Sequence, residues 1–119
     1  MQDLESAKEV GKALAATLAK SNAVVIASSD FTHYESQERV IKKDLAALKA
    51  VEELDVNQFY KTIETENVSA CGYAPIAALM TYAKIAGAQR AKLLSYKTSG
   101  DTTGDFSSVV GYAALMVTR

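Results

Sequence analysis

Two short segments of this 119-residue chain hold the side chains best suited to chemistry. Residues 28–34 have the sequence SSDFTHY, follow directly on the apolar run AVVIA at 23–27, and contain the only histidine. Residues 70–75 have the sequence ACGYAP and contain the only cysteine. A buried strand that ends in hydroxyl, carboxylate and imidazole groups is typical of open α/β sheets, whose ligands bind outside the carboxyl ends of the strands. The two segments together therefore predict one active cleft.

Asp30 and His33 are close in sequence, on the turn expected after the strand. A carboxylate beside an imidazole can fix the imidazole tautomer and stabilise its cation, as a general acid or base requires. The alternative is that Asp30 caps the turn and that His33 is an ordinary hydrogen-bonded residue. Ser28 and Ser29 could supply a nucleophile, but the Gly-x-Ser-x-Gly elbow is missing from the sequence, which favours turn capping for both.

Cys71 precedes Pro75 by four residues, and proline is favoured in the first turn of a helix. Cys71 is therefore expected at a helix N-terminus, where exposed N–H groups and the helix dipole favour the thiolate. The alternative is a buried cysteine that acts as a small apolar residue. A catalytic zinc or iron site normally has three protein ligands. The sequence offers one imidazole and one thiol, so no metal is expected to bind to this chain alone.

Composition excludes several classes of protein. The apolar content of 49% and charged content of 23% are ordinary for a globular domain. A formal net charge of −1 gives no electrostatic case for binding nucleic acid or an anionic membrane. No apolar run approaches the roughly 20 residues that a membrane-spanning helix needs. Since a single cysteine cannot form an internal disulfide, we expect a cytoplasmic protein.

The hydrophobic pattern predicts an α/β fold: a small mixed sheet of about three strands flanked by helices. A first helix is expected over 4–18 with Asp3 as its N-cap, and a second over 36–54 with Ile41, Leu45 and Leu48 on one face. A short third helix is expected to begin at a capping box formed by Asp55 and Gln58. A fourth is expected from Pro75 to Gly87. Strands are expected over 23–28, 92–97 and 109–117, the first of them buried on both faces because its apolar run does not alternate. Residues 99–105 are expected to form a mobile polar turn, and the alternating charges from 35 to 53 a solvated helix face.

The order of the elements bears on domain organisation. In an α/β fold the first helix should pack beside a preceding strand, and the predicted pattern has none. We therefore expect residues 1–119 to form a single α/β domain that is the C-terminal part of a larger one. A domain that lacks strands exposes a sheet edge and an apolar face, so a homo-oligomer is expected.

Three motifs resemble those of a known family, the Memo-like proteins. Residues 25–34, VIASSDFTHY, resemble the family's Ser-Ser-Asp-Phe-x-His-aromatic signature, and residues 71–75 its Cys-Gly-x-x-Pro helix start. Residues 107–114, SSVVGYAA, are similar to its last strand. The motifs occur in family order and span nearly the whole chain, but family members are considerably longer. The family resembles the class III extradiol dioxygenases in fold, so the resemblance implies the C-terminal half of a dioxygenase-like domain.

The resemblance also implies a metal site. By resemblance, Cys71 is a thiolate ligand for iron or another divalent transition metal, together with two upstream histidines that this sequence does not contain. His33 and Asp30 lie in the same cleft as acid/base or positioning groups. The function implied for the longer parent is a metal-dependent, dioxygenase-like redox activity. Two alternatives stay open: metal-free thiol hydrolysis by Cys71, His33 and Asp30, and a non-catalytic module that binds a small molecule or a peptide.

Overall fold

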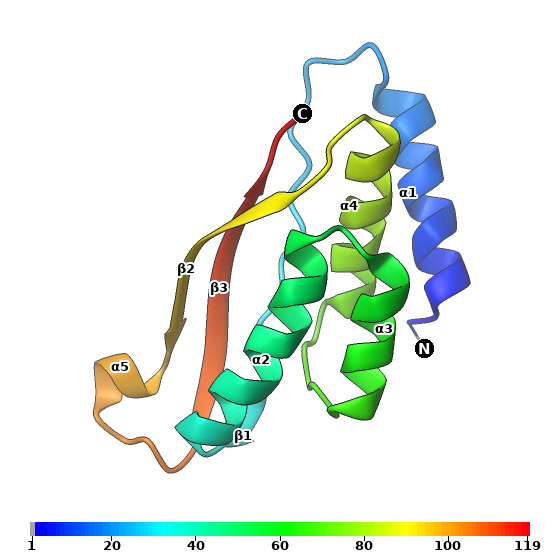
Figure 1. Cartoon of the computed structure of the whole chain (residues 1–119). Coiled ribbons are helices and arrows are strands. Elements are labelled where there is room, and N and C mark those ends of the chain that lie inside the picture. The colour runs from blue at the N-terminus through cyan, green and yellow to red at the C-terminus, as the bar shows by residue number, and fades with distance from the viewer. Residues whose placement is uncertain (1) are drawn as a thin grey trace.

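The computed structural model, which describes residues 2–119, contains five helices and three strands (Figure 1). The predicted α/β fold class is confirmed. None of the described helices is both long and apolar enough to cross a membrane. In chain order the elements are α1 (Leu4–Leu18), β1 (His33–Glu35), α2 (Gln37–Glu52), α3 (Val56–Thr65), α4 (Tyr73–Ile85), β2 (Ala91–Thr98), α5 (Gly100–Thr103) and β3 (Val109–Val117).

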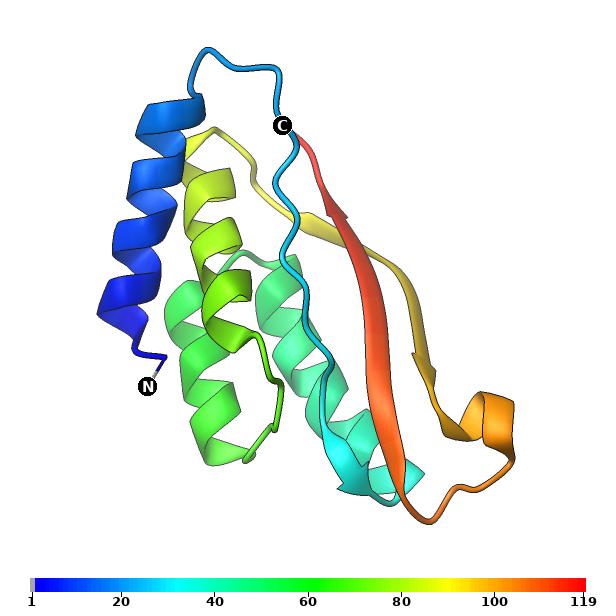
Figure 2. The same cartoon turned by 180° about the vertical axis from the view of Figure 1, so that it is seen from behind.

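The long C-terminal strand β3 is the centre of the sheet. The strand order is β1-β3-β2, and both pairings are antiparallel, so the three-stranded sheet is antiparallel and not mixed as predicted. β2 and β3 form a hairpin with a register shift between Leu93 and Ser95, whereas β1 is short and pairs through only two of its residues. The strands predicted over 92–97 and 109–117 are therefore confirmed, and the sheet that they form lies to one side of the helices (Figure 2).

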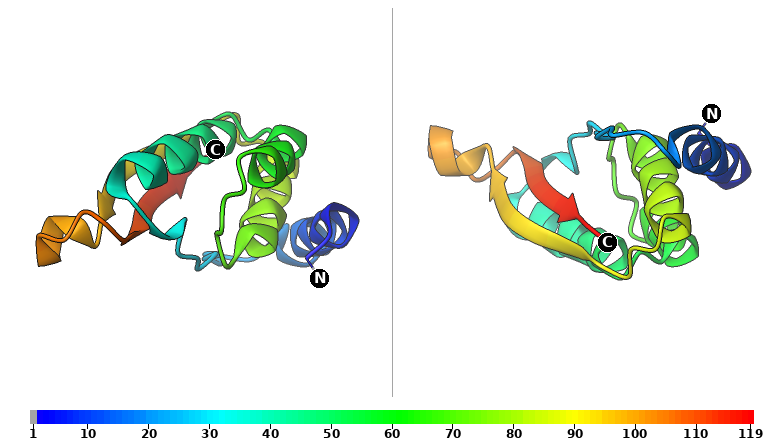
Figure 3. Two further views of the ribbon diagram at one scale, coloured as in Figure 1. Left: turned by 90° about the horizontal axis from the view of Figure 1, so that it is seen from below. Right: turned by 90° about the horizontal axis from the view of Figure 1, so that it is seen from above.

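The helix boundaries follow the capping signals in the sequence. The Asp3 carboxylate accepts a hydrogen bond from the Ser6 amide at the start of α1, and Asp55 accepts one from the Gln58 amide at the start of α3. Pro75 lies in the first turn of α4, as predicted. α2 covers β2 and β3, while α1 packs along α4 on the other side of the molecule (Figure 3).

The strand predicted over 23–28 is wrong. These residues are not assigned to any strand, and their side chains are not buried on both faces: Val24 is 87% exposed and Ile26 is 84% exposed. At the edge of β3 opposite β2, the only paired strand among the described residues is β1, so no described strand pairs with residues 23–28. A cavity of about 580 Å³ separates it from α4 and β3. An apolar run forms a strand only where a partner lies beside it, and here the partner is missing.

The turn predicted over 99–105 is also more ordered than expected. It contains the one-turn helix α5, which ends at Gly104 with a φ of 78°. The Thr98 amide donates to the Asp101 carboxylate, and the Ser107 amide donates to the Asp105 carboxylate. Short polar side chains thus replace the missing backbone partners of the turn.

One buried carboxylate on α2 contradicts the predicted solvated helix face. Asp44 is fully buried; its Oδ1 accepts hydrogen bonds from the amide and the hydroxyl of Thr32 at 3.0 Å and 2.6 Å, and its Oδ2 accepts one from Tyr96 Oη at 2.7 Å. Burial and the hydrogen bond to Asp44 raise the pKa of Tyr96, so its hydroxyl stays a donor. A Cβ at Gly111 would collide with the same carboxylate.

α2 therefore buries a different set of residues from the one expected. Of the face predicted from Ile41, Leu45 and Leu48, only Leu48 is fully buried, and Leu45 is 46% exposed. The Asp44 carboxylate occupies the middle of the buried face and ties α2 to the residue just before His33.

We expect replacement of Asp44 by alanine to lower the free energy of unfolding by about 3 kcal/mol, because it leaves a buried amide and two hydroxyl groups without their acceptor. Urea denaturation measures the loss. The control is Glu64→Ala on the exposed side of α3, which should change stability by less than about 0.5 kcal/mol. Equal stability of the two variants would contradict the structural role of the Asp44 carboxylate.

Candidate functional site

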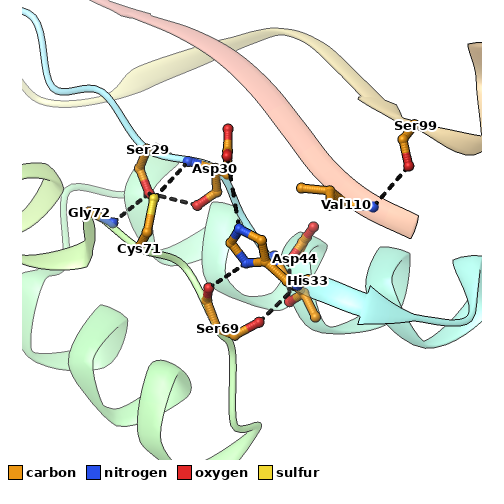
Figure 4. Close-up of polar contacts among 10 residues, drawn as sticks. Ser29, Asp30, His33, Asp44, Ser69, Cys71, Gly72, Ser99 and Val110 are labelled. Carbon is orange, nitrogen blue, oxygen red and sulfur yellow. Dashed lines mark hydrogen bonds and ion pairs between the residues drawn. The ribbon is translucent and has the colours of Figure 1, made fainter. Parts of the chain in front are cut away.

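The only cysteine lies at the start of α4, as the sequence predicted. Gly72 is the N-cap of that helix, and Cys71 precedes it and is exposed, which excludes the alternative of a buried apolar cysteine. Its Sγ accepts a hydrogen bond from the Asp30 amide at 3.3 Å and lies 3.8 Å from Ser29 Oγ (Figure 4).

Ser29 joins the two motifs, which are 42 residues apart in the sequence. Its Oγ accepts a hydrogen bond from the Gly72 amide at 2.8 Å and donates to the Asp30 carbonyl at 2.6 Å. The approach is close because position 72 is glycine: a Cβ there would lie 2.5 Å from the Ser28 carbonyl oxygen. The sequence predicted that Ser29 caps its own turn, and the structure shows that it also caps the start of a distant helix.

His33 is held in one orientation by Ser69. The His33 amide donates to Ser69 Oγ at 2.8 Å, and His33 Nδ1 lies 2.8 Å from the Ser69 carbonyl oxygen. Because a carbonyl oxygen can only accept, Nδ1 must carry the proton. In the neutral ring, Nε2 is then the basic nitrogen, and it lies 3.8 Å from Asp30 Oδ2 (Figure 4).

Asp30 is therefore the point at which the sulfur and the imidazole meet. Its backbone N–H faces Cys71 Sγ, and its carboxylate faces His33 Nε2. The groups lie at the surface, since the Asp30 side chain is 51% exposed and the His33 side chain 23% exposed. Neither the 580 Å³ cavity nor a second one of about 410 Å³ beside α1 is lined by His33 or Cys71. His33 and Cys71 therefore lie outside both cavities, so neither cavity is the cleft that the sequence predicted.

Comparison with known proteins places this arrangement in a family. The sequence matches the profile of the Memo-like proteins over residues 1–116. The chain belongs to the Memo-like family. It is 48% identical over 118 residues to a MEMO1 family protein of Methanocaldococcus jannaschii, 48% identical over 115 residues to one of Thermoplasma acidophilum, and 46% identical over 114 residues to one of Nitrosopumilus maritimus. The resemblance drawn from the three motifs is confirmed.

The matches to these Memo-like relatives cover nearly all of this chain but less than half of each relative. The matches cover 98%, 97% and 96% of this chain, but only 41%, 42% and 42% of the respective relatives. The chain therefore spans about two fifths of the length of the relatives that it matches.

The donor atoms of this Memo-like chain do not by themselves fit a metal ion. Within residues 2–119, no three side chains of histidine, cysteine, aspartate or glutamate are grouped so that they could share one. Cys71 Sγ already accepts a hydrogen bond from a backbone amide, and His33 Nε2 faces a carboxylate rather than the sulfur. A complete site with three protein ligands would require donors beyond this set.

Sequence reasoning missed two of the three further residues that contact this site, Ser69 and Gln2. Ser69 orients His33, Gln2 donates from its side chain to the Cys71 carbonyl at 3.0 Å, and Tyr34 has a left-handed φ of 59° with its ring edge-on to His33. Ser69 lies two residues before Cys71, which is a weak signal, and nothing in the sequence marks Gln2. Tyr34 is the last residue of the SSDFTHY segment, directly after the histidine, and that position is the signal that marks it.

We expect the single imidazole to give one resolved set of ¹⁵N signals, with the proton on Nδ1 in the neutral folded chain. Unfolding in urea removes the Ser69 carbonyl from Nδ1 and should shift the neutral ring toward the Nε2–H form. Long-range ¹H–¹⁵N correlation spectra distinguish the two tautomers. Asp30→Asn should leave the tautomer unchanged, because Ser69 rather than Asp30 fixes it. A folded chain with the proton on Nε2 would contradict the geometry.

Proposed function

We propose that this chain contributes a sulfur ligand and an acid–base pair to a metal-dependent, dioxygenase-like redox site. The observation that carries the proposal is the meeting of Cys71 Sγ and His33 Nε2 at Asp30. Membership of the Memo-like family supports the assignment, because these residues lie in the motifs on which the resemblance to the family was based. We also propose that residues 1–119 are the C-terminal part of a longer family polypeptide, whose remainder supplies the other ligands.

Cys71 is the proposed ligand, for iron or another divalent transition metal. The Asp30 amide and the Ser29 hydroxyl hold the sulfur at an exposed point before α4. The described residues do not complete a metal site, so the other ligands would come from the rest of the longer polypeptide. The thiol has no partner cysteine, which suits a reducing cytoplasm, the compartment that we propose for the protein.

His33 and Asp30 are the proposed acid–base pair. With Nδ1 donating to Ser69, the neutral ring offers the lone pair of Nε2 to a proton on the substrate. Once Nε2 is protonated, the Asp30 carboxylate 3.8 Å away stabilises the resulting charge. The substrate class that we propose is a small molecule or a peptide.

The metal-free alternative has less support from the geometry. A thiol hydrolase needs its base within hydrogen-bond reach of the nucleophile. Among the described residues, the contacts of Cys71 Sγ are with the Asp30 amide and Ser29 Oγ, whereas His33 Nε2 faces the Asp30 carboxylate. Among the described residues the sulfur therefore has no imidazole within hydrogen-bond reach, and the His33 imidazole is assigned to a different proton.

Oxygen uptake tests the proposal in a family-length protein that carries this chain and is loaded with ferrous iron. We expect Cys71→Ser to remove bound iron and uptake together. His33→Ala should keep the iron but lower the rate by about 100-fold or more, because it removes the proton acceptor. Glu64→Gln, an exposed change on α3, is the control. Unchanged uptake in both site variants would remove these residues from the mechanism. If the family-length protein binds no metal, the result would favour the alternative of a non-catalytic binding module.

The partner that we propose for the exposed segment 21–29 is a second copy of this chain. The segment carries no charge, and its backbone pairs with no described strand. Antiparallel pairing centred on Val25 would place Val24 of each copy opposite Ile26 of the other. The same pairing would bring Lys20, at one end, toward Asp30 at the other. Unpaired apolar edges of this kind are templates for strand addition.

We expect the purified chain to form dimers whose proportion rises with concentration in sedimentation equilibrium. Ile26→Lys should shift the equilibrium to the monomer, because it places a charge at the centre of the proposed contact. The matched control, Ile85→Lys, changes an isoleucine that is 55% exposed at the end of α4 and should leave the dimer intact. A monomeric wild-type chain, or a dimer unaffected by Ile26→Lys, would contradict the pairing.

A further inference from the structure

The start of α4 is capped by the side chain of Gln2, which lies near the N-terminus of the chain. The N-cap residue, Gly72, has no side chain with which to cap the helix. Gln2 takes this role: its Oε1 accepts a hydrogen bond from the Ala74 amide at 3.0 Å, while its Nε2 donates to the Cys71 carbonyl at 3.0 Å. One side-chain amide thus binds the backbone on both sides of Gly72, directly at the cysteine.

Gln2 is itself held in place. Its carbonyl accepts a hydrogen bond from Tyr60 Oη at 3.0 Å, and the Tyr60 ring packs edge-on against Tyr73 at 5.4 Å. Burial raises the pKa of Tyr60 to about 12, so the hydroxyl is protonated and able to donate at neutral pH. The next residue, Asp3, caps α1. Gln2 therefore connects α1 and α3 to the first turn of α4.

The position of the sulfur depends on this backbone. The Cys71 carbonyl is bound by Gln2, and the amide that follows it, Gly72 N–H, is bound by Ser29 Oγ. With the peptide fixed at both groups, Sγ lies 3.3 Å from the Asp30 amide. If Gln2 released the carbonyl, only the Ser29 contact would hold the peptide, and the sulfur could turn away from Asp30.

We propose that Gln2 is a positioning residue, whose side-chain amide fixes the Cys71 peptide and so keeps Sγ against the Asp30 amide. The significance of this inference rests on the proposed role of Cys71 as a ligand, but the contact that it concerns exists without any metal.

Two substitutions separate positioning from helix capping. Gln2→Glu keeps an oxygen acceptor for the Ala74 amide, and a carboxylate is favourable at a helix N-terminus, so the helix should stay capped. The same change removes the donor to the Cys71 carbonyl and places an oxygen against it. Gln2→Ala removes both contacts. The matched control is Gln58→Glu on α3, where the glutamine amide bonds to Thr62 within its own helix.

Hydrogen exchange of the Asp30 amide, in the metal-free 119-residue chain, measures the contact with the sulfur. The Phe31 amide is the internal reference, because it bonds to the Gly111 carbonyl at 2.9 Å and does not involve Cys71. We expect exchange at Asp30 to become about fivefold faster in Gln2→Glu and in Gln2→Ala, the effect of losing about one hydrogen bond, while Phe31 changes little. Gln58→Glu should leave both amides at the wild-type rate, and Gln2→Glu should keep the wild-type urea midpoint.

Three results would overturn the proposal: unchanged exchange at Asp30 in both Gln2 variants, a parallel rise at Asp30 and Phe31, or wild-type exchange at Asp30 in Gln2→Glu alone. The second would show that Gln2 only stabilises the fold, and the third that it only caps α4. Because the readout needs neither iron nor oxygen, its failure is distinguishable from failure of the redox proposal.

Discussion

The structure depends on the hydrogen bonds that the buried Asp44 carboxylate accepts from Thr32 and Tyr96. A charge removed from water is costly unless donors surround it, and here an amide and two hydroxyl groups do so. The arrangement holds three segments together at one point: α2 through Asp44, β2 through Tyr96, and the chain just before β1 through Thr32. The last contact matters most for the site, because it fixes the backbone from which Asp30 and His33 extend.

A series of hydrogen bonds connects the buried Asp44 carboxylate to the exposed groups of the site. The Phe31 amide bonds to β3, Ser29 bonds to the start of α4, and the sulfur comes to lie against the Asp30 amide. Backbone contacts and the side chains of Ser29 and Gln2 together set the distances in the site. Each of these surface contacts competes with water and is weak alone, whereas the hydrogen bonds to the buried Asp44 carboxylate do not compete with water.

The sequence predicted best what depends on neighbouring residues. The caps at Asp3 and Asp55 and the proline in the first turn of α4 act within one helical turn, and all are found where expected. The prediction for residues 23–28 was wrong because a strand depends on a partner, which local sequence does not reveal. Asp44 was misjudged for a related reason: it lies among alternating charges, and only the positions of Thr32 and Tyr96 make its burial possible.

The same distinction explains why the site was only partly predictable. The types of Asp30, His33 and Cys71 indicate chemistry. Cys71 lies at the predicted helix start, whereas Asp30 and His33 do not follow a strand over 23–28. What orients them comes from elsewhere in the chain, from Ser69 for the imidazole and from Ser29 and Gln2 for the cysteine. These are common polar residues with no distinctive spacing. A site held by such partners keeps its geometry before any ligand arrives, and this preorganisation lets an exposed surface place a sulfur and an imidazole reproducibly.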